Sequence, residues 1–251
     1  MAEPLRVGLV YPELLGTYGD RGNGDVLVWR ATRRGVAAEL VEVRAPAPVP
    51  GDLDAYVLGG GEDAAQETVA ELLRSAAGDG LRAAVAEDRP VLAVCGALQL
   101  LGRTYADGAG RRTDGLGLLD LDTTAAEPRL VGEVVVRTRE GELLTGFENH
   151  GGRTRLGPGA APLGTVLQGA GNNGQDDTEG VRQGALVATY LHGPVLARNP
   201  FLADALLAAA LARLGLDPGV LTPLDPDPSR QLHLARLHAA AAKERGRRRR
   251  R

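Results

Sequence analysis

The chain is poor in cysteine and in aromatic residues. Among its 251 residues there is one cysteine, Cys95, and aromatic residues make up 3%. A single cysteine excludes an internal disulfide and any zinc site built from several cysteines. This pattern fits a reducing cytosol. Hydrophobic residues still reach 43% of the chain, so Val, Leu and Ala must fill the core.

Long hydrophobic runs and a net positive charge are also missing. No apolar stretch approaches the roughly 18 residues of a membrane-spanning helix, and the first six residues lack the apolar segment of a secretion signal. The formal net charge is −3 although the last nine residues are strongly basic, so the body of the chain is acidic. We therefore expect a soluble cytoplasmic protein that has no transmembrane segment and no nucleic-acid footprint. It would reach a membrane only through a partner.

Buried strands alternate with helical patterns over the first hundred residues. The apolar runs predict strands, and the patterns between them predict helices that cover both faces of a mostly parallel sheet. This is the α/β class. The expected strands are 5–11, 38–43, 55–58 and 90–94, and the expected helices are 20–34, 64–77 and 81–86.

The second half of the chain has more glycine and more turn signals. We expect strands at 129–137, 163–168 and 185–191, and then an amphipathic helix at 199–214. Proline-rich turns after residue 217 end this pattern. One domain over residues 5–215 follows, and residues 216–251 would form a weaker helix at 231–242 and a basic, disordered tail.

The first chemical signal is Cys95. A buried strand ends at this residue, and a helical pattern begins directly after it at Gly96. A sharp strand-to-helix turn of this kind exposes a nucleophile above the edge of a sheet. The adjacent helix N-terminus would favour the thiolate form. The alternative is an inert core cysteine that behaves as a small hydrophobic residue.

The second signal is a glycine run, Gly59-Gly60-Gly61, at the end of the preceding strand. Glycines allow the backbone to approach a ligand closely. The N–H groups of Gly60, Gly61 and Gly96 could therefore stabilise a developing oxyanion. The alternative is an ordinary glycine-rich turn capped by Asp63.

The third signal is His192, which ends an apolar strand and precedes a Gly-Pro turn. An imidazole fixed there can act as an acid and a base near neutral pH. His150 is the competing candidate, whereas His233 and His238 lie on one predicted helix. A purely structural histidine is the alternative for each.

Together the three signals predict thiol acyl transfer. The thiolate would attack the carboxamide of glutamine, form a thioester and release ammonia. The histidine would protonate the leaving group and then activate water.

Two of these motifs resemble the class I glutamine amidotransferases. Cys95 is followed four residues later by Gln99, as in the nucleophile turn of that family. The run Tyr190-Leu191-His192-Gly193-Pro194, with no His-x-Glu, resembles the branch that holds the glutaminase domain of cobyric acid synthase and the glutaminase subunits of lipid II isoglutaminyl synthases. The resemblance extends over residues 5–214, and further matching stretches are 17–23, 59–63, 147–154 and 171–174.

The resemblance implies a flavodoxin-like fold and a glutaminase subunit. Its partner would be a Mur-ligase-like subunit, MurT, which uses ATP and magnesium to amidate the D-glutamate α-carboxyl of lipid II in cell-wall biosynthesis. No cofactor or metal is expected in this chain. By the same analogy Arg129 binds the glutamine α-carboxylate, Gln99 helps to form the pocket, and Asn149 and His150 lie at its rim. A surface arginine and an ordinary first-turn glutamine are the alternatives.

The sequence departs from the family at two places. Ala97 stands where many class I enzymes have glycine, so a less sharp turn is expected. No carboxylate follows two residues after His192, so the acid that orients the histidine is expected from the partner, and activity of the chain alone is in doubt.

Three rival functions stay open. A cobyrinic or cobyric acid amidotransferase is one, although the chain has no phosphate-binding Gly-x-x-x-x-Gly-Lys-Ser/Thr loop. An independent thiol hydrolase and a binding subunit with an inert cysteine are the others.

Overall fold

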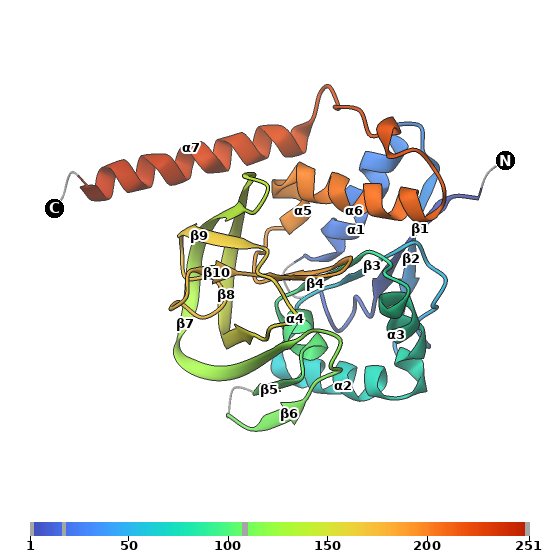
Figure 1. Cartoon of the computed structure of the whole chain (residues 1–251), viewed down its shortest axis with the longest axis horizontal. Helices are drawn as coiled ribbons and strands as arrows, with labels where there is room; N and C mark the ends of the chain where they lie inside the picture. The colour runs from blue at the N-terminus through green and yellow to red at the C-terminus, as the bar shows by residue number, and fades with distance from the viewer. Residues whose placement is uncertain (1–2, 17–18, 107–109, 249–251) are drawn as a thin grey trace.

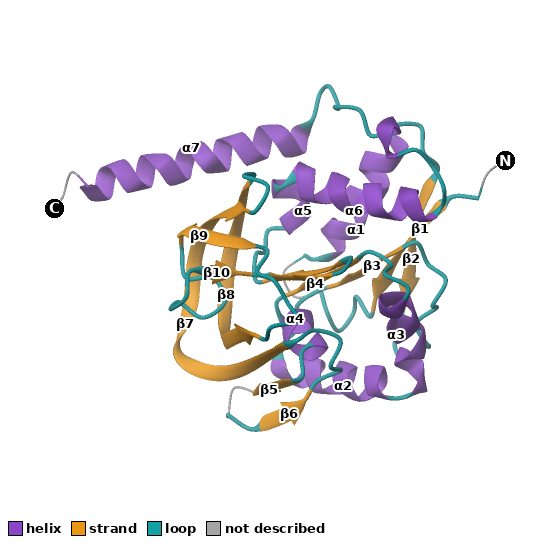
Figure 2. Ribbon diagram, in the orientation of Figure 1, coloured by secondary structure: helices purple, strands orange, loops and turns teal. Residues whose placement is uncertain are grey.

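A computed structural model describes residues 3–16, 19–106 and 110–248. A six-stranded central sheet has the order β11-β12-β4-β3-β1-β2. Figure 2 draws its strands β1, β2, β3 and β4 in orange between layers of purple helices. Five of its strands are parallel and β11, at one edge, is antiparallel. The strands are β1 (Leu5–Val10), β2 (Ala38–Val43), β3 (Ala55–Leu58), β4 (Val91–Val94), β11 (Val181–Gln183) and β12 (Leu186–Thr189). The predicted α/β class is confirmed.

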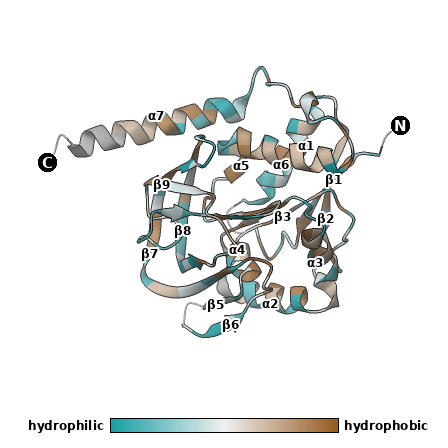
Figure 3. Ribbon diagram, viewed as in Figure 1, coloured by the Kyte–Doolittle hydropathy of each residue, from teal (hydrophilic) through white to brown (hydrophobic). Residues whose placement is uncertain are grey.

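Helices cover both faces of this sheet, as Figure 1 shows. On one face lie α1 (Arg21–Thr32), α5 (Val195–Arg198) and α6 (Pro200–Arg213). On the other lie α2 (Asp63–Arg74), α3 (Asp79–Ala86) and α4 (Gly96–Leu101). Every residue of β3, β4 and β12 is buried, because a doubly covered strand meets no water on either side. Figure 3 accordingly shows hydrophobic colours along the central strands.

A second sheet, which the sequence predicted only in pieces, packs beside the first. Its order is β10-β9-β7-β5-β6, and β8 pairs with β7 in a long antiparallel hairpin. Backbone hydrogen bonds join the two sheets, because His192 donates to Phe147 (2.9 Å) and accepts from it (3.2 Å). The strands are β5 (Thr104–Ala106), β6 (Arg112–Asp114), β7 (Leu121–Thr138), β8 (Leu143–Leu156), β9 (Gly164–Gln168) and β10 (Thr178–Glu179).

The last helix is longer than predicted. Helix α7 (Pro228–Arg248) starts before and ends after the expected 231–242, and it includes part of the basic run. The expected disorder of the tail stays a prediction. Its first turns pack on the body, where Ser229 and His233 are buried, and the rest extends away (Figure 1). Residues 249–251 lie outside the described part. Among the described residues no helix combines the length and the apolar character needed to cross a membrane.

Candidate active site

Cys95 lies in a strained turn between β4 and α4. Its φ is 52°, a left-handed conformation that costs free energy in any residue but glycine and is typical of functional sites. A Cβ atom on Gly96 would lie 2.5 Å from Gln66 Nε2, so any other residue there would require the Gln66 side chain to move. Ala97 is buried and does not prevent this conformation. The expectation of a less sharp turn stays a prediction.

Three side chains converge on Gly60. A Cβ atom added to this glycine would lie 3.3 Å from Cys95 Cβ, 3.4 Å from His192 Cε1 and 3.5 Å from Asp20 Oδ2. Cys95 and His192, from the ends of two adjacent parallel strands, thus meet at one edge of the central sheet. His192, not His150, is the histidine beside the thiol.

The third of these side chains is Asp20. We expected the orienting carboxylate from a partner, and that expectation stays a prediction. Within the chain, Asp20 is a candidate for the same role, because it lies directly before α1, is fully buried and has Oδ1 at 3.8 Å from His192 Nδ1. Asp20 belongs to one of the motifs that carried the resemblance, so a signal was present. Its neighbours Thr17 and Tyr18 lie outside the described residues.

The environment of His192 favours its charged form. Burial lowers the pKa of His192, but the side chains of Asp20 and Cys95 raise it more, to about 9. The ring is therefore an imidazolium at neutral pH. Such a cation can give a proton to a leaving amine.

One of the three predicted oxyanion donors is occupied. The N–H of Gly60 donates to Asp20 Oδ2 at 2.7 Å, so in this conformation it holds the carboxylate and is no free donor. Gly96 is the first residue of α4, where a helical N–H has no partner within its own helix. Gly61 accepts a bond from Gln66 Nε2 at its carbonyl (2.8 Å). The N–H groups of Gly96 and Gly61 are thus the candidates that remain.

The predicted substrate-binding residues lie on both sides of β8. Arg129, an exposed residue of β7, donates from Nε to Asn149 Oδ1 (3.2 Å) and from Nη2 to the Asn149 carbonyl (3.0 Å). Gln99 approaches the same strand, since a Cβ atom on Gly152 would lie 2.5 Å from its Nε2. The structure thus joins Arg129 to Asn149 and places Gln99 beside β8, the strand that carries Asn149.

His150 does not lie at a rim. It is 1% exposed, and its ring stacks on that of Tyr190 with centroids 3.6 Å apart and planes 8° apart. Gln99 Nε2 donates to the Tyr190 hydroxyl at 3.2 Å. The predicted position of His150 is therefore wrong, because its strand turns that side chain into the interior. The sequence analysis gave no role to Tyr190.

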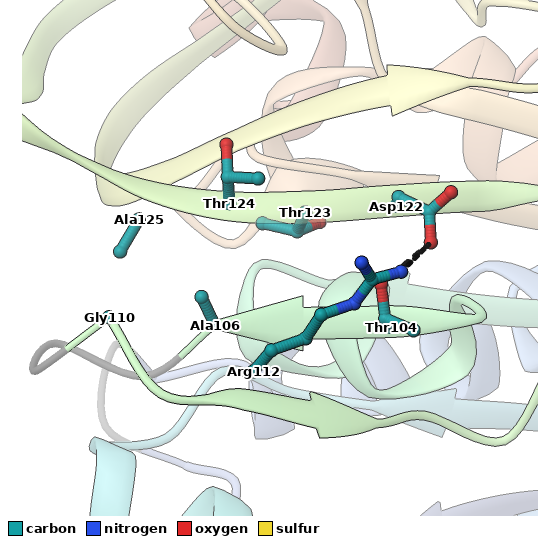
Figure 4. Close-up of a pocket in the computed structure, with 8 residues that line it drawn as sticks. All are labelled: Thr104, Ala106, Gly110, Arg112, Asp122, Thr123, Thr124 and Ala125. Carbon is teal, nitrogen blue, oxygen red and sulfur yellow. Dashed lines mark hydrogen bonds and ion pairs between the residues drawn. The ribbon is translucent and has the colours of Figure 1, made fainter.

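A separate pocket of about 410 Å³ opens between β5, β6 and β7 (Figure 4). It contains neither Cys95 nor His192; its lining residues are Thr104, Ala106, Gly110, Arg112, Asp122, Thr123, Thr124 and Ala125. Within the described ranges, no three His, Cys, Asp or Glu side chains come together in a way that could hold a metal ion.

Comparison with known proteins gives a consistent family. Residues 6–200 match the CobB/CobQ-like glutamine amidotransferase domain. The chain is 37% identical to the lipid II isoglutaminyl synthase (glutamine-hydrolyzing) subunit GatD of Staphylococcus aureus, over 80% of this chain and 82% of that one. It shares 35% identity with the subunit of the same name from Streptococcus pneumoniae, over 83% of this chain and 81% of that one. A cobyric acid synthase of Methylorubrum populi is 38% identical, over 71% of this chain and 35% of that enzyme.

Solved structures agree in fold. A glutamine amidotransferase of Thermotoga maritima superposes with a TM-score of 0.53 at 18% identity, covering 94% of this chain and 96% of that one. PurLQS of the same organism superposes with a TM-score of 0.54 at 17% identity, covering 85% of this chain and 100% of that one. At this identity the likeness concerns the fold alone.

Proposed function

Since the chain belongs to the CobB/CobQ-like family of glutamine amidotransferases, we propose that it hydrolyses L-glutamine through a Cys95 thioester and supplies the ammonia to a Mur-ligase-like partner. The observation that carries the chemistry is the convergence of Cys95, His192 and Asp20 on Gly60. A nucleophile, an acid–base and an orienting carboxylate meet there at the end of parallel strands, where ligands of open α/β sheets bind.

The reaction follows from these contacts. The Cys95 thiolate attacks the carboxamide carbon, and the N–H groups of Gly96 and Gly61 stabilise the oxyanion. The His192 imidazolium gives its proton to the departing nitrogen, so ammonia leaves and a thioester remains. The ring, now neutral, takes a proton from water, which attacks the thioester and releases glutamate. Asp20 keeps the ring oriented and stabilises its charge in both halves of the reaction.

Recognition of glutamine falls to the residues along β8. The guanidinium of Arg129, positioned by Asn149, would bind the α-carboxylate with a charge-assisted pair. The Gln99 amide, one helical turn after Cys95, would border the pocket from the other side.

The acceptor of ammonia is proposed from the relatives. The two GatD proteins are named as subunits of a synthase that acts on lipid II. We infer a MurT-like partner that binds ATP and magnesium, activates the D-glutamate α-carboxyl and receives the ammonia at the inner face of the membrane. The match covers 82% of the S. aureus subunit but 35% of a cobyric acid synthase. The extent of the match favours a role in lipid II amidation over one in corrin synthesis.

A glutamine-analogue chloroketone tests the glutaminase half. The chain holds one cysteine, so mass spectrometry should find a single adduct at Cys95 that excess L-glutamine suppresses. No adduct, even with the partner bound, would overturn the proposal. An adduct that D-glutamine suppresses equally well would overturn the assigned substrate.

A further inference from the structure

Glu179 is a buried carboxylate that the reaction above does not use. It ends β10 in the second sheet, and its exposed fraction is 0%. Its Oε1 atom accepts hydrogen bonds from the Thr189 hydroxyl (2.9 Å) and from the Tyr190 N–H (2.8 Å). A buried carboxyl group is costly unless such bonds offset its loss of water.

Thr189, the residue that Glu179 holds, connects the nucleophile with the histidine. Its carbonyl accepts the N–H of Cys95 at 2.8 Å. Its hydroxyl accepts the N–H of Leu191, the residue before His192, at 3.0 Å. One threonine at the end of β12 therefore fixes the backbone on both sides of the reacting pair.

We propose that Glu179 is a positioning residue for the glutaminase reaction, setting the spacing of Cys95 and His192 through Thr189. This inference rests on the proposed function of the site. The second sheet thereby does more than carry substrate-binding residues, because it also holds the end of the central strand that leads to the catalytic histidine. A misplacement of reacting groups by about 1 Å can cost on the order of 100-fold in rate, so this control should be visible in turnover.

The surroundings of Glu179 suit its neutral form. Burial, the largest influence, raises the pKa of Glu179 to about 7, and the bonds from Tyr190 and Thr189 offset it only in part. The negative charge of Glu148, in β8, raises the pKa further. Among the described atoms Glu179 Oε2 has no hydrogen-bond partner, so nothing there replaces the water that a charged oxygen would lose. Oε1 becomes a stronger acceptor when Glu179 ionises, because hydrogen bonds to a carboxylate are stronger than those to a neutral acid.

A neighbouring carboxylate, Glu148, also affects the pKa of Glu179. Glu148 accepts the N–H groups of Ala170 and Gly171, each at 2.9 Å. It also lies 3.9 Å from His150 Nε2. The Tyr190 hydroxyl has its own pKa raised by burial to about 12, so it stays neutral over the range in question. Glu148 is therefore the group whose removal shifts the ionisation of Glu179 toward lower pH.

The test compares Glu179→Leu, Glu179→Gln and Thr189→Val with a matched control, Thr145→Val. The control is at another buried threonine, Thr145, whose hydroxyl has no hydrogen-bond partner among the described atoms. Glutamine turnover gives kcat and KM from pH 6 to pH 8.5. Alkylation by iodoacetamide gives the reactivity of Cys95 independently, because no other thiol is present.

We expect Glu179→Leu and Thr189→Val to lower kcat about 10- to 100-fold and to slow alkylation, with KM changed less than about twofold. Glu179→Gln keeps an acceptor oxygen but cannot ionise, so this variant should retain most activity at pH 6.5. Its kcat relative to wild type should then fall toward pH 8.5, where the wild-type carboxylate is the stronger acceptor. In Glu148→Gln the change in kcat that follows the ionisation of Glu179 should begin at a lower pH than in wild type.

Wild-type kcat in both Glu179→Leu and Thr189→Val would overturn the inference, as would losses confined to KM. If Glu179→Leu fails to fold, the pH dependence of Glu179→Gln decides, and a profile identical to wild type contradicts the inference. A wild-type chain that alkylates normally but never hydrolyses glutamine, with or without partner, would refute the proposed function alone. The alkylation rates would still test Glu179.

Discussion

Asp20 favours the charged form of His192 in the active site. It is a main cause of the raised pKa of His192, and it also fixes the N–H of Gly60. One carboxylate thus controls the imidazolium and the backbone that faces the thiol. Since this group lies within the chain, the isolated chain should hydrolyse glutamine measurably.

Asp20→Asn should lower kcat/KM by roughly 100- to 10,000-fold, as loss of an orienting carboxylate does in related catalytic arrangements. The sign of the pH effect follows from linkage. Asp20 raises the pKa of His192, so its removal should bring the high-pH limb of the rate profile down from about 9 toward the ordinary histidine range. Asp25→Asn, an exposed acid in α1, is the control. An unchanged profile would return the orienting role to the partner.

The role of Arg129 in binding glutamine can be tested separately from its contribution to stability. Arg129→Ala should raise KM for glutamine about 10- to 100-fold with little change in unfolding free energy, because the arginine is exposed and its loss strands the substrate carboxylate. Steady-state kinetics measure the shift. Arg155→Ala, an exposed arginine of β8 that donates to Gln175, should leave KM unchanged. Equal KM values in the two variants would remove Arg129 from the site.

Among the elements, α1 is held by an ion-pair cluster. Arg30 is 2% exposed and donates to Asp204 of α6 (2.7 Å) and to Asp227 before α7 (3.0 Å). Breaking a buried pair by removing one partner leaves uncompensated charge and costs about 3–5 kcal/mol. Because α1 begins directly after Asp20, this cluster also supports the position of the orienting carboxylate.

Arg30→Met should therefore lower the free energy of unfolding by about 3 kcal/mol, toward the small end of that range because Asp204 is 27% exposed. Urea denaturation measures the change. Arg44→Met removes an exposed arginine that pairs with Glu42, and it should cost under about 1 kcal/mol. Similar losses of unfolding free energy in both variants would show that the buried cluster stabilises the fold no more than an exposed ion pair does.

The elements that the sequence predicted well are those with continuous apolar runs. Strands β2 and β3 have the expected bounds, because turn residues flank both. Burial on both faces requires apolar side chains throughout β3, whereas β2, at the edge of the sheet, carries two glutamates among its apolar residues. Strand β8 was missed. Its sequence, LLTGFENHGGRTRL, is rich in glycine and polar residues, and its pairing with β7 depends on contacts that no local pattern contains.

At the scale of the molecule, the site was predicted where it follows from topology. Cys95 and His192 end neighbouring parallel strands, so their meeting could be inferred from strand ends alone. Asp20 and the occupied N–H of Gly60 could not, because a loop before α1 brings them together only in the folded chain. His150 was misplaced for the same reason, since its strand was not recognised.

We propose that Cys95 acts only in the release of ammonia from glutamine and takes no part in the amidation of lipid II itself. Amidation by the complex of this chain with the proposed Mur-ligase-like partner, using either L-glutamine or ammonium as nitrogen donor, tests this. Cys95→Ser should abolish amidation with glutamine and leave amidation with ammonium at the wild-type rate. Equal loss with both donors would contradict the account, because it would make Cys95 a structural residue of the complex.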